Sequence, residues 1–272
     1  MADFFAGRGD GPGLALFLNA GDPPLEVLAD LIPALDDVGV DCLELAVPFP
    51  DSVTDGPVIR RSAQRALAAG ADLDSVLALV ARVRPGLRRM RIALLTDWSH
   101  SLKRRPLAEA IREIADSGAD GLLVHALPPR LSEPYLAATR AAGLPVVTTC
   151  YHGTSTPQTM AKAATHASAY LYLVAHYGRS GTRPGAGYDG LAASVAHLRG
   201  LTTAPIAVGF GVRTRADVAA VHACGADAAI VGSAAVATVE ESLLARRDVV
   251  EDLCDFARHL QPAAAPFSVS RE

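Results

Sequence analysis

Short apolar runs alternate along the chain with longer segments that have helical spacing. The short runs are apolar nearly throughout, which is typical of strands buried on both faces. They cover residues 14–19, 42–47, 91–96, 121–126, 145–150, 170–175, 205–210 and 228–233. Between them, apolar residues recur every three or four positions, which predicts amphipathic helices. These helical segments are 24–39, 59–70, 73–83, 106–118, 132–143, 156–167, 190–200 and 215–225.

This alternation predicts a parallel sheet covered by helices. Eight strand-helix units in 272 residues favour a single closed (β/α)8 barrel, the TIM barrel, over residues 1–272. Residues 1–13 are expected to form a short lead, and residues from about 262 to 272 a disordered tail. The alternative is a doubly wound open sheet. It is disfavoured because no GxGxxG motif follows the first strand.

Composition narrows the class of protein. About half of the residues are hydrophobic and the net charge is −4, with acids and bases scattered. No basic stripe of the kind that binds nucleic acid is present, so nucleic acid is not an expected partner. The start of the chain lacks the pattern of a signal peptide, and no later apolar run is long enough to span a bilayer. We therefore expect a cytoplasmic protein that has no membrane partner.

The cysteine and histidine spacing does not indicate a metal site. The four cysteines are far apart and form no CxxC pair, so they are expected to be small buried hydrophobes. The eight histidines show neither HExxH nor HxH spacing. No bound metal is expected.

Three acids cluster around the second predicted strand. In the stretch LELAVPFPDSVTDGPVIR, Glu44 lies within that strand, and Asp51 and Asp55 lie in the loop that follows it. Function in a barrel of this type sits at the carboxyl ends of the strands and in the loops after them. A carboxylate in an apolar setting is costly unless it is paired or used. Alternatively, Glu44 is a hydrogen-bonded interior carboxylate and the aspartates only cap turns.

Small residues end the last strands and indicate an anion site. Backbone amides at Gly209, Gly211, Gly232 and Ser233, each close to a helix start, suit a phosphate group. The loop after the sixth strand, HYGRSGTRPGAG, adds Gly181 and is expected to close over a ligand. The alternative is that these glycines only mark tight turns. A phosphorylated substrate is the favoured interpretation.

These motifs together resemble the tryptophan synthase alpha subunit family over nearly the whole chain. The resemblance is carried by NAGDP, LELAVPFPDSVTDGPVI, YLYLV, GRSG, VGFGV and IVGS, of which the ELxxPFxDxxxDGP pattern is the most specific. It implies a carbon–carbon lyase that cleaves indole-3-glycerol phosphate to indole and glyceraldehyde 3-phosphate by a retro-aldol reaction. It also implies that no cofactor is needed.

The resemblance assigns roles to individual residues. Glu44 stands at the catalytic glutamate and Asp55 at the aspartate that contacts the indole nitrogen, while Tyr172 matches an active-site tyrosine. Gly181, Gly211, Gly232 and Ser233 match positions that bind the substrate phosphate. Phe17 matches an aromatic that lines the indole pocket.

Departures from the family pattern concern its loops. LLTDWSHSLKR replaces a tyrosine and asparagine region after the third strand, and Ala126 replaces an aspartate after the fourth. Pro50 and Ser52 replace a serine and a proline in the loop after the second strand, and Ser180 a threonine after the sixth. Several of these positions dock the beta subunit in the family.

Because the loops differ from the family pattern, neither the partner nor the exact substrate is determined by the resemblance. We expect that the lyase chemistry is retained. Binding of a beta-like subunit is doubtful, and the substrate is either indole-3-glycerol phosphate or an analogue with a substituted indole ring. Trp98, the only tryptophan, is a candidate for the indole pocket by its place after the third strand, although packing against a helix would also explain it. The other functions considered are a non-catalytic or regulatory partner of a beta-like protein, and another phosphate-binding barrel isomerase.

Overall fold

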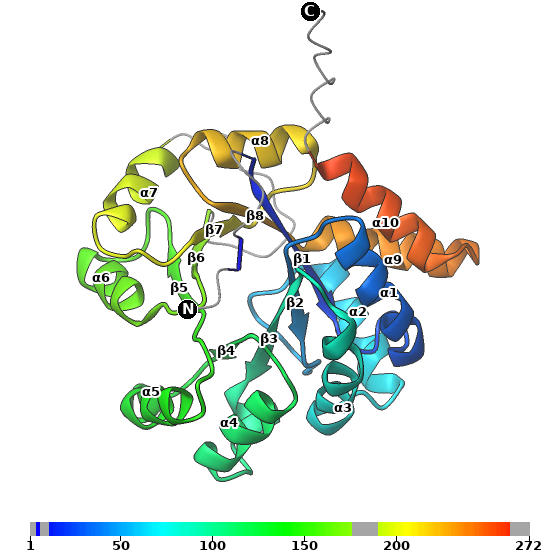
Figure 1. Ribbon diagram of the computed structural model, residues 1–272, viewed down its shortest axis with the longest axis horizontal. Coiled ribbons are helices and arrows are strands. Elements are labelled where there is room, and N and C mark those ends of the chain that lie inside the picture. Colours follow the sequence, from blue (N-terminus) through cyan, green and yellow to red (C-terminus); the bar gives the residue numbers. More distant parts are fainter. Residues whose placement is uncertain (1–3, 6–10, 176–189, 262–272) are drawn as a thin grey trace, which may run out of the picture.

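The computed structural model describes residues 4–5, 11–175 and 190–261. Eight parallel strands are arranged in the order β4-β3-β2-β1-β8-β7-β6-β5 and form a nearly closed barrel (Figure 1). The strands are β1 (Gly13–Asn19), β2 (Cys42–Ala46), β3 (Arg91–Asp97), β4 (Gly121–His125), β5 (Thr148–Tyr151), β6 (Leu171–Val174), β7 (Ile206–Gly209) and β8 (Ala228–Val231). The predicted TIM-barrel fold is therefore confirmed, and each predicted run overlaps one of these strands.

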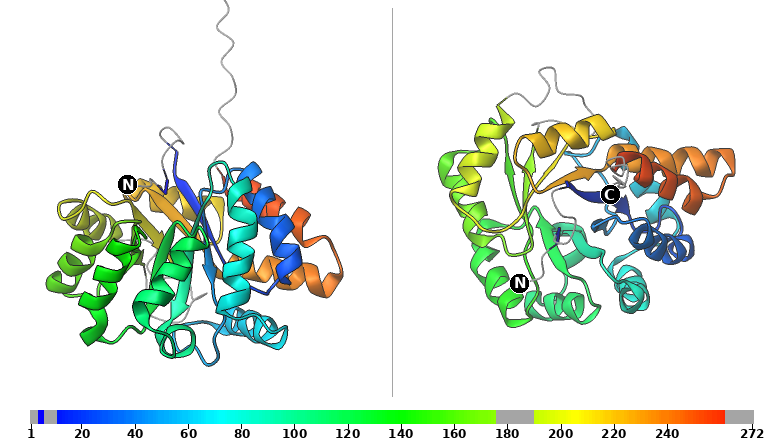
Figure 2. Two further views of the ribbon diagram at one scale, coloured as in Figure 1. Left: turned by 60° about the horizontal axis from the view of Figure 1, so that its bottom comes forward. Right: turned by 45° about the horizontal axis from the view of Figure 1, so that its top comes forward.

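Helices surround the strands on the outside, as two further views show (Figure 2). They are α1 (Leu25–Asp37), α2 (Pro57–Ala68), α3 (Leu73–Val83), α4 (Leu107–Asp116), α5 (Ser132–Ala141), α6 (Pro157–His166), α7 (Leu191–Arg199), α8 (Arg215–Ala223), α9 (Ser233–Ala245) and α10 (Val249–Leu260). The first eight coincide with the predicted segments. Helices α9 and α10 are not among the predicted segments. Among the described residues, no helix has the length and apolar character needed to cross a membrane.

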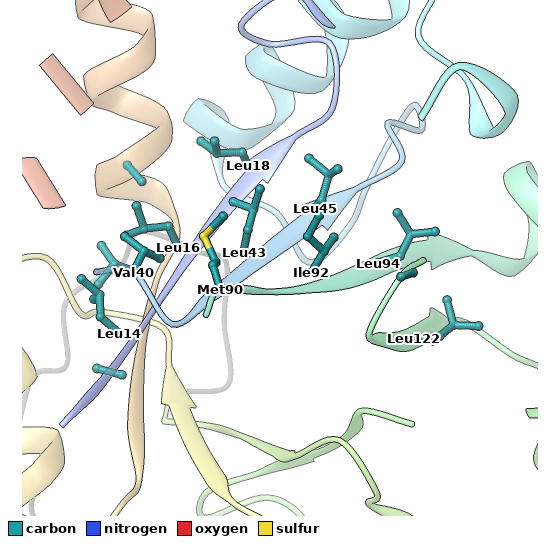
Figure 3. Packing of buried hydrophobic residues seen from close by; sticks show 14 of the residues in the cluster. Leu14, Leu16, Leu18, Val40, Leu43, Leu45, Met90, Ile92, Leu94 and Leu122 are labelled. Atoms are coloured by element: carbon teal, nitrogen blue, oxygen red, sulfur yellow. The ribbon is translucent and has the colours of Figure 1, made fainter. Parts of the chain in front are cut away.

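Alternation along the strands divides the apolar residues into two layers. Leu14, Leu16 and Leu18 on β1 point outward with Leu43 and Leu45 on β2, and they pack in the main core between sheet and helices (Figure 3). Residues at the alternate positions of these strands, such as Ala15 on β1 and Cys42 on β2, pack in a second cluster inside the barrel. Since successive side chains in a strand point to opposite faces, this register turns Glu44 into the barrel.

Two phenylalanines near the start of the chain join the inner cluster. Phe4 and Phe5 are buried, and their rings lie 5.4 and 5.6 Å from the ring of Tyr170 in edge-on arrangements. They surround Tyr170 with apolar surface, and the hydroxyl of Tyr170 contacts Glu44. Residues 1–13 were expected to be only a short lead, so this contact was not foreseen. The expected disordered tail, from about 262 to 272, lies outside the described residues.

Candidate active site

Glu44 lies in the middle of β2, with only 1% of its surface exposed. The Tyr170 hydroxyl donates a hydrogen bond of 2.5 Å to Oε1 of Glu44. Burial raises the pKa of Glu44 to about 7, and this hydrogen bond acts in the opposite direction. A carboxyl group with a pKa near neutrality can both give and take a proton under physiological conditions. The same burial, with the nearby Glu44 charge, holds the pKa of Tyr170 well above its ordinary value.

The raised pKa makes the stability of the fold depend on pH. Glu44 binds its proton more tightly in the folded chain than in the unfolded chain, whose ordinary value is 4.5. The stabilisation that proton binding at Glu44 gives to the folded chain is therefore complete below pH 4.5 and is lost as the pH rises through 7. We expect the free energy of unfolding to fall by roughly 2 to 3 kcal/mol more in the wild type than in Glu44→Gln between pH 5 and pH 8. Urea unfolding of both proteins measures this difference, and parallel pH profiles would contradict it.

Asp55 reaches the same cavity from the loop between β2 and α2. A cavity of about 580 Å³ is lined by Glu44 and Asp55 together, within the size range of about 300 to 1,000 Å³ of small-molecule sites. Burial raises the pKa of Asp55, whereas a hydrogen bond from Ser52 and the nearby His125 lower it. Asp51, by contrast, is exposed and does not line this cavity. The structure thus separates the two loop aspartates.

Tyr172 interacts with both acids. It lies on β6 and lines the cavity, and both Glu44 and Asp55 add to burial in raising its pKa well above the ordinary value. Its hydroxyl is therefore a neutral hydrogen-bond donor. Phe17, which is paired with Glu44 across β1 and β2, forms another part of the cavity wall.

Gly209 makes room for Tyr172. A Cβ atom added at Gly209 would lie 2.5 Å from the Tyr172 hydroxyl oxygen and 2.9 Å from two ring carbons. Gly209 does not line the cavity, so its amide is not placed where the sequence analysis expected a phosphate contact. The glycine signal at this position is explained by the approach of an aromatic ring from the neighbouring strand.

We expect Gly209→Ala to displace the Tyr172 ring. Overpacking of this kind costs about 1 to 3 kcal/mol of stability, and turnover should fall as well because Tyr172 faces the cavity. Gly232→Ala is a control for stability, since its Cβ would meet nothing closer than 3.6 Å. Denaturant unfolding of both variants and steady-state rates of Gly209→Ala and the wild type measure the effect. Equal stability of the two would show that Tyr172 does not need the space.

The other predicted phosphate residues gather at the ends of β7 and β8. Gly211, Gly232 and Ser233 all line the cavity. Gly211 has a φ of +92°, a conformation that favours glycine. Gly232 and Ser233 begin α9, so backbone N–H groups at this helix start are available to an anion. Gly181 lies outside the described residues.

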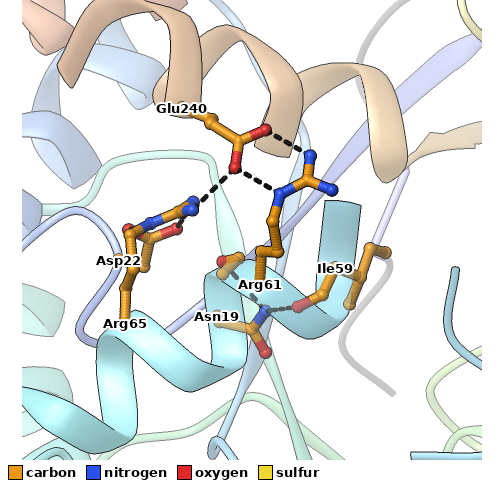
Figure 4. A network of polar contacts seen from close by, with 7 residues as sticks. Asn19, Asp22, Ile59, Arg61, Arg65 and Glu240 are labelled. Carbon is orange, nitrogen blue, oxygen red and sulfur yellow. Dashed lines mark hydrogen bonds and ion pairs between the residues drawn. The ribbon is translucent and has the colours of Figure 1, made fainter. Parts of the chain in front are cut away.

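Ion pairs join α9 to α2, the helix that follows Asp55. Arg61 and Arg65 on α2 bind Glu240 on α9 at 2.6 and 2.7 Å, and Arg65 also binds Asp22 at 2.7 Å (Figure 4). The two arginines lower the pKa of Glu240 to about 2. Because α2 begins two residues after Asp55, the network fixes the acid loop against α9.

Asn19 joins α2 to β1 from inside the barrel. Its side-chain amide donates hydrogen bonds of 3.2 Å to the Ile59 carbonyl and 3.0 Å to the Ser62 hydroxyl (Figure 4). Asn19 also lines the cavity. Asn19 belongs to the NAGDP motif but had no predicted role, and its place at the carboxyl end of a strand was the available signal.

Trp98 does not line the cavity. It begins a single π-helical turn, Trp98–Leu102, and packs against the main hydrophobic core. The same turn presents His100, whose Nδ1 donates a hydrogen bond of 2.7 Å to the carboxylate of buried Asp97 and whose ring stacks on Phe49 at 5.6 Å. His125 stacks on Phe49 as well, at 6.2 Å, and lines the cavity. The aromatic side chains that border this part of the site are thus Phe49 and His125.

Within the described ranges, no three histidine, cysteine or acidic side chains are grouped so that they could hold a metal ion. Cys42, Cys150 and Cys254 are buried and Cys224 is partly buried. The cavity brings together the carboxyl groups of Glu44 and Asp55, the side chain of Tyr172, and the helix start at Gly232 and Ser233.

Comparison with known proteins agrees with this geometry. Residues 8–265 match the family model described as tryptophan synthase alpha chain. The alpha chain of Gloeobacter violaceus is 36% identical over 253 residues, which cover 93% of this chain and 90% of that protein. The alpha chain of Acaryochloris marina is 38% identical over 243 residues, with 89% and 90% covered.

Solved structures lead to the same family. A mutant tryptophan synthase alpha subunit from Pyrococcus furiosus superposes with a TM-score of 0.81 at 26% identity, covering 92% of this chain and 98% of that one. Tryptophan synthase from M. tuberculosis, in an aminoacrylate-bound form, gives 0.79 at 26% identity with 94% and 97% covered. The chain therefore belongs to the tryptophan synthase alpha chain family of aldolase-type lyases, and it cleaves indole-3-glycerol phosphate to indole and glyceraldehyde 3-phosphate.

Proposed function

We propose that Glu44 and Asp55 carry this cleavage and that the chain performs it without a beta subunit. The observation that carries the proposal is the single cavity that Glu44 and Asp55 share with Gly211, Gly232 and Ser233. One substrate can then hold its phosphate at the start of α9 while its indole ring lies between the acids. Phe17 is proposed to form part of the wall against this ring.

Glu44 is proposed to act first as an acid and then as a base. Its carboxyl proton goes to C3 of the indole, where the electron pair of the ring double bond forms the new C–H bond. The bond between C3 and the glycerol carbon then breaks, and its electron pair returns to the ring. The hydroxyl on that glycerol carbon gives its proton to the Glu44 carboxylate as the aldehyde forms. A pKa of about 7 suits both steps.

Asp55 is proposed to stabilise the intermediate charge. Protonation at C3 places positive charge on the ring nitrogen, and a carboxylate that accepts the N–H hydrogen bond favours that state. The hydrogen bond from Ser52 and the nearby His125 support the ionised form of Asp55 against burial. Tyr172 is proposed to donate a hydrogen bond to the reacting hydroxyl or to Glu44, because its raised pKa keeps it neutral.

Phosphate binding is proposed for the backbone amides at the start of α9 and at Gly211. A helix start offers unpaired N–H groups and the positive end of the helix dipole. Ser233 would add its hydroxyl to the same anion. Gly181 remains a sequence-based proposal, since it lies outside the described residues.

Independence from a beta subunit is proposed from the loop after β2. Ser52, which departs from the family pattern, is buried and supports Asp55 by a hydrogen bond within the chain. The acid is then positioned without a partner. We expect isolated protein to form indole at a rate within about twofold of protein mixed with a tryptophan synthase beta subunit. The measurement is glyceraldehyde 3-phosphate release with and without that subunit, and an increase of tenfold or more would overturn this part of the proposal.

A further inference from the structure

The wall of the barrel is open between β4 and β5. Two backbone hydrogen bonds of 2.9 Å join these segments, from Leu122 N to the Pro145 oxygen and from Val147 N to the Leu122 oxygen. They belong to one isolated bridge between Leu122 and Val146. No further backbone bond connects β4 with β5 in the part of the chain that the structure describes. Every other neighbouring pair continues as a regular ladder.

The active-site cavity passes through this opening to the outer layer of helices. Val124 on β4 and Thr149 on β5 line it at the wall. Ser132 on α5 and Lys162 on α6 line it outside the barrel, where these two helices lie beside the opening (Figure 1). We call this part of the cavity the β4–β5 opening. It extends the site beyond the space enclosed by the strands.

The chemistry of the β4–β5 opening differs from that of the barrel interior. Lys162 is exposed, and no carboxylate within the described ranges forms an ion pair with it. Ser132 and Thr149, which carry hydroxyl groups, line the cavity with it, and Val146 and Leu136 add apolar walls. An ammonium group with nearby hydroxyls favours a ligand group that accepts hydrogen bonds and carries negative charge.

The strand order places this opening opposite the proposed phosphate site. In the closed order of the barrel, β4 is four strands away from β8 in either direction. A substrate that is anchored at the start of α9 and spans the cavity therefore extends toward β4. This step rests on the function proposed above.

We propose that the β4–β5 opening is a subsite for an anionic substituent, such as a carboxylate, on the six-membered ring of the indole. Lys162 binds the charge, and the wall between β4 and β5 is left open so that the substituent can pass. The substrate class is then a ring-substituted indole glycerol phosphate.

Binding of unreactive analogues tests the subsite separately from turnover. The probes are indole-3-propanol phosphate and its four monocarboxylated derivatives, which are isomers of one another that carry the carboxylate at different positions of the six-membered ring; binding is measured by calorimetry. We expect at least one isomer to bind wild type as tightly as the parent compound. Lys162→Met should weaken that isomer by about fivefold, the size of a charge-assisted hydrogen bond at an exposed site, and leave the parent compound unchanged. Lys103→Met is the matched control, because Lys103 is exposed and does not line the cavity.

Each result has a defined meaning. If wild type binds every carboxylated isomer more than about tenfold more weakly than the parent, the subsite is overturned. The subsite is also overturned if Lys162→Met weakens binding of the carboxylated compound and of the parent compound equally, or weakens binding of neither. If the parent compound does not bind and indole-3-glycerol phosphate is not cleaved, the proposed function has failed. Cleavage of indole-3-glycerol phosphate with rejection of all the isomers removes only the subsite.

Discussion

Glu44→Gln is expected to slow indole formation by at least about 100-fold, the scale of general acid–base catalysis. Glutamine has the same size and can still accept the hydrogen bond from Tyr170, but it cannot give a proton to C3 or take one from the hydroxyl. Because the side chain is buried and already fits its place, the substitution removes the titration and keeps the packing. Single-turnover rates with indole-3-glycerol phosphate measure the loss.

Asp51→Asn is the matched control for this experiment. Asp51 is an acid in the loop that follows β2, it is exposed, and it does not line the cavity. Its φ of +57° is one that asparagine tolerates. We expect the control to keep nearly all activity. If Glu44→Gln keeps more than a tenth of wild-type turnover, Glu44 is not the proton donor.

Asp55→Asn is expected to lower the rate of cleavage strongly and to change substrate affinity little. Positive charge builds on the indole nitrogen only as C3 is protonated, so an ionised acceptor acts mainly on the transition state. We expect a loss of about 10²- to 10³-fold in the single-turnover rate. This is the size of the loss when one hydrogen-bond donor is removed from the oxyanion hole of other enzymes. Calorimetric dissociation constants of a non-reacting analogue measure the ground state.

The alternative role of Asp55 is to order the loop before Gly56 and Pro57. In that case the substitution would loosen the loop and weaken binding as much as it slows cleavage. Ser52→Ala helps to separate the two roles, because it removes the hydrogen bond that lowers the pKa of Asp55 and leaves the carboxylate itself. We expect it to shift the pH profile of cleavage upward. Equal losses of rate and affinity in Asp55→Asn would rule out the electrostatic role.

The strands could be predicted because burial on both faces leaves a local pattern. Leu43 and Leu45 face the helices and Cys42 packs in the inner cluster, so the run around Glu44 reads as apolar throughout and the acid stands out. The glycines at the ends of the last strands could also be recognised in the sequence. Their separate roles could not be predicted, because the difference between Gly209 and Gly232 depends on which side chain approaches each glycine from another strand.

Contacts between distant segments explain most of what the sequence did not reveal. Tyr170 and Glu44 are 126 residues apart, and the rings of Phe4 and Phe5 that enclose Tyr170 come from the start of the chain. The opening between β4 and β5 arises because few backbone hydrogen bonds join these strands. Nothing in the sequence indicates it, since Val124 and Thr149 are residue types that are common in strands. Trp98 was a candidate for the pocket because of its place after the third strand, with packing as the alternative, and a π-helical turn places it against the core.

Product analysis of a single turnover by the isolated wild-type chain tests the central claim most directly. The protein is mixed in excess with indole-3-glycerol phosphate, without a beta subunit, and indole and glyceraldehyde 3-phosphate are quantified over time. We expect the two products to appear together in equal amounts, with a rate that requires Glu44 and Asp55 in the same cavity. Absence of indole from the isolated wild type, under conditions in which the substrate is bound, would contradict this account.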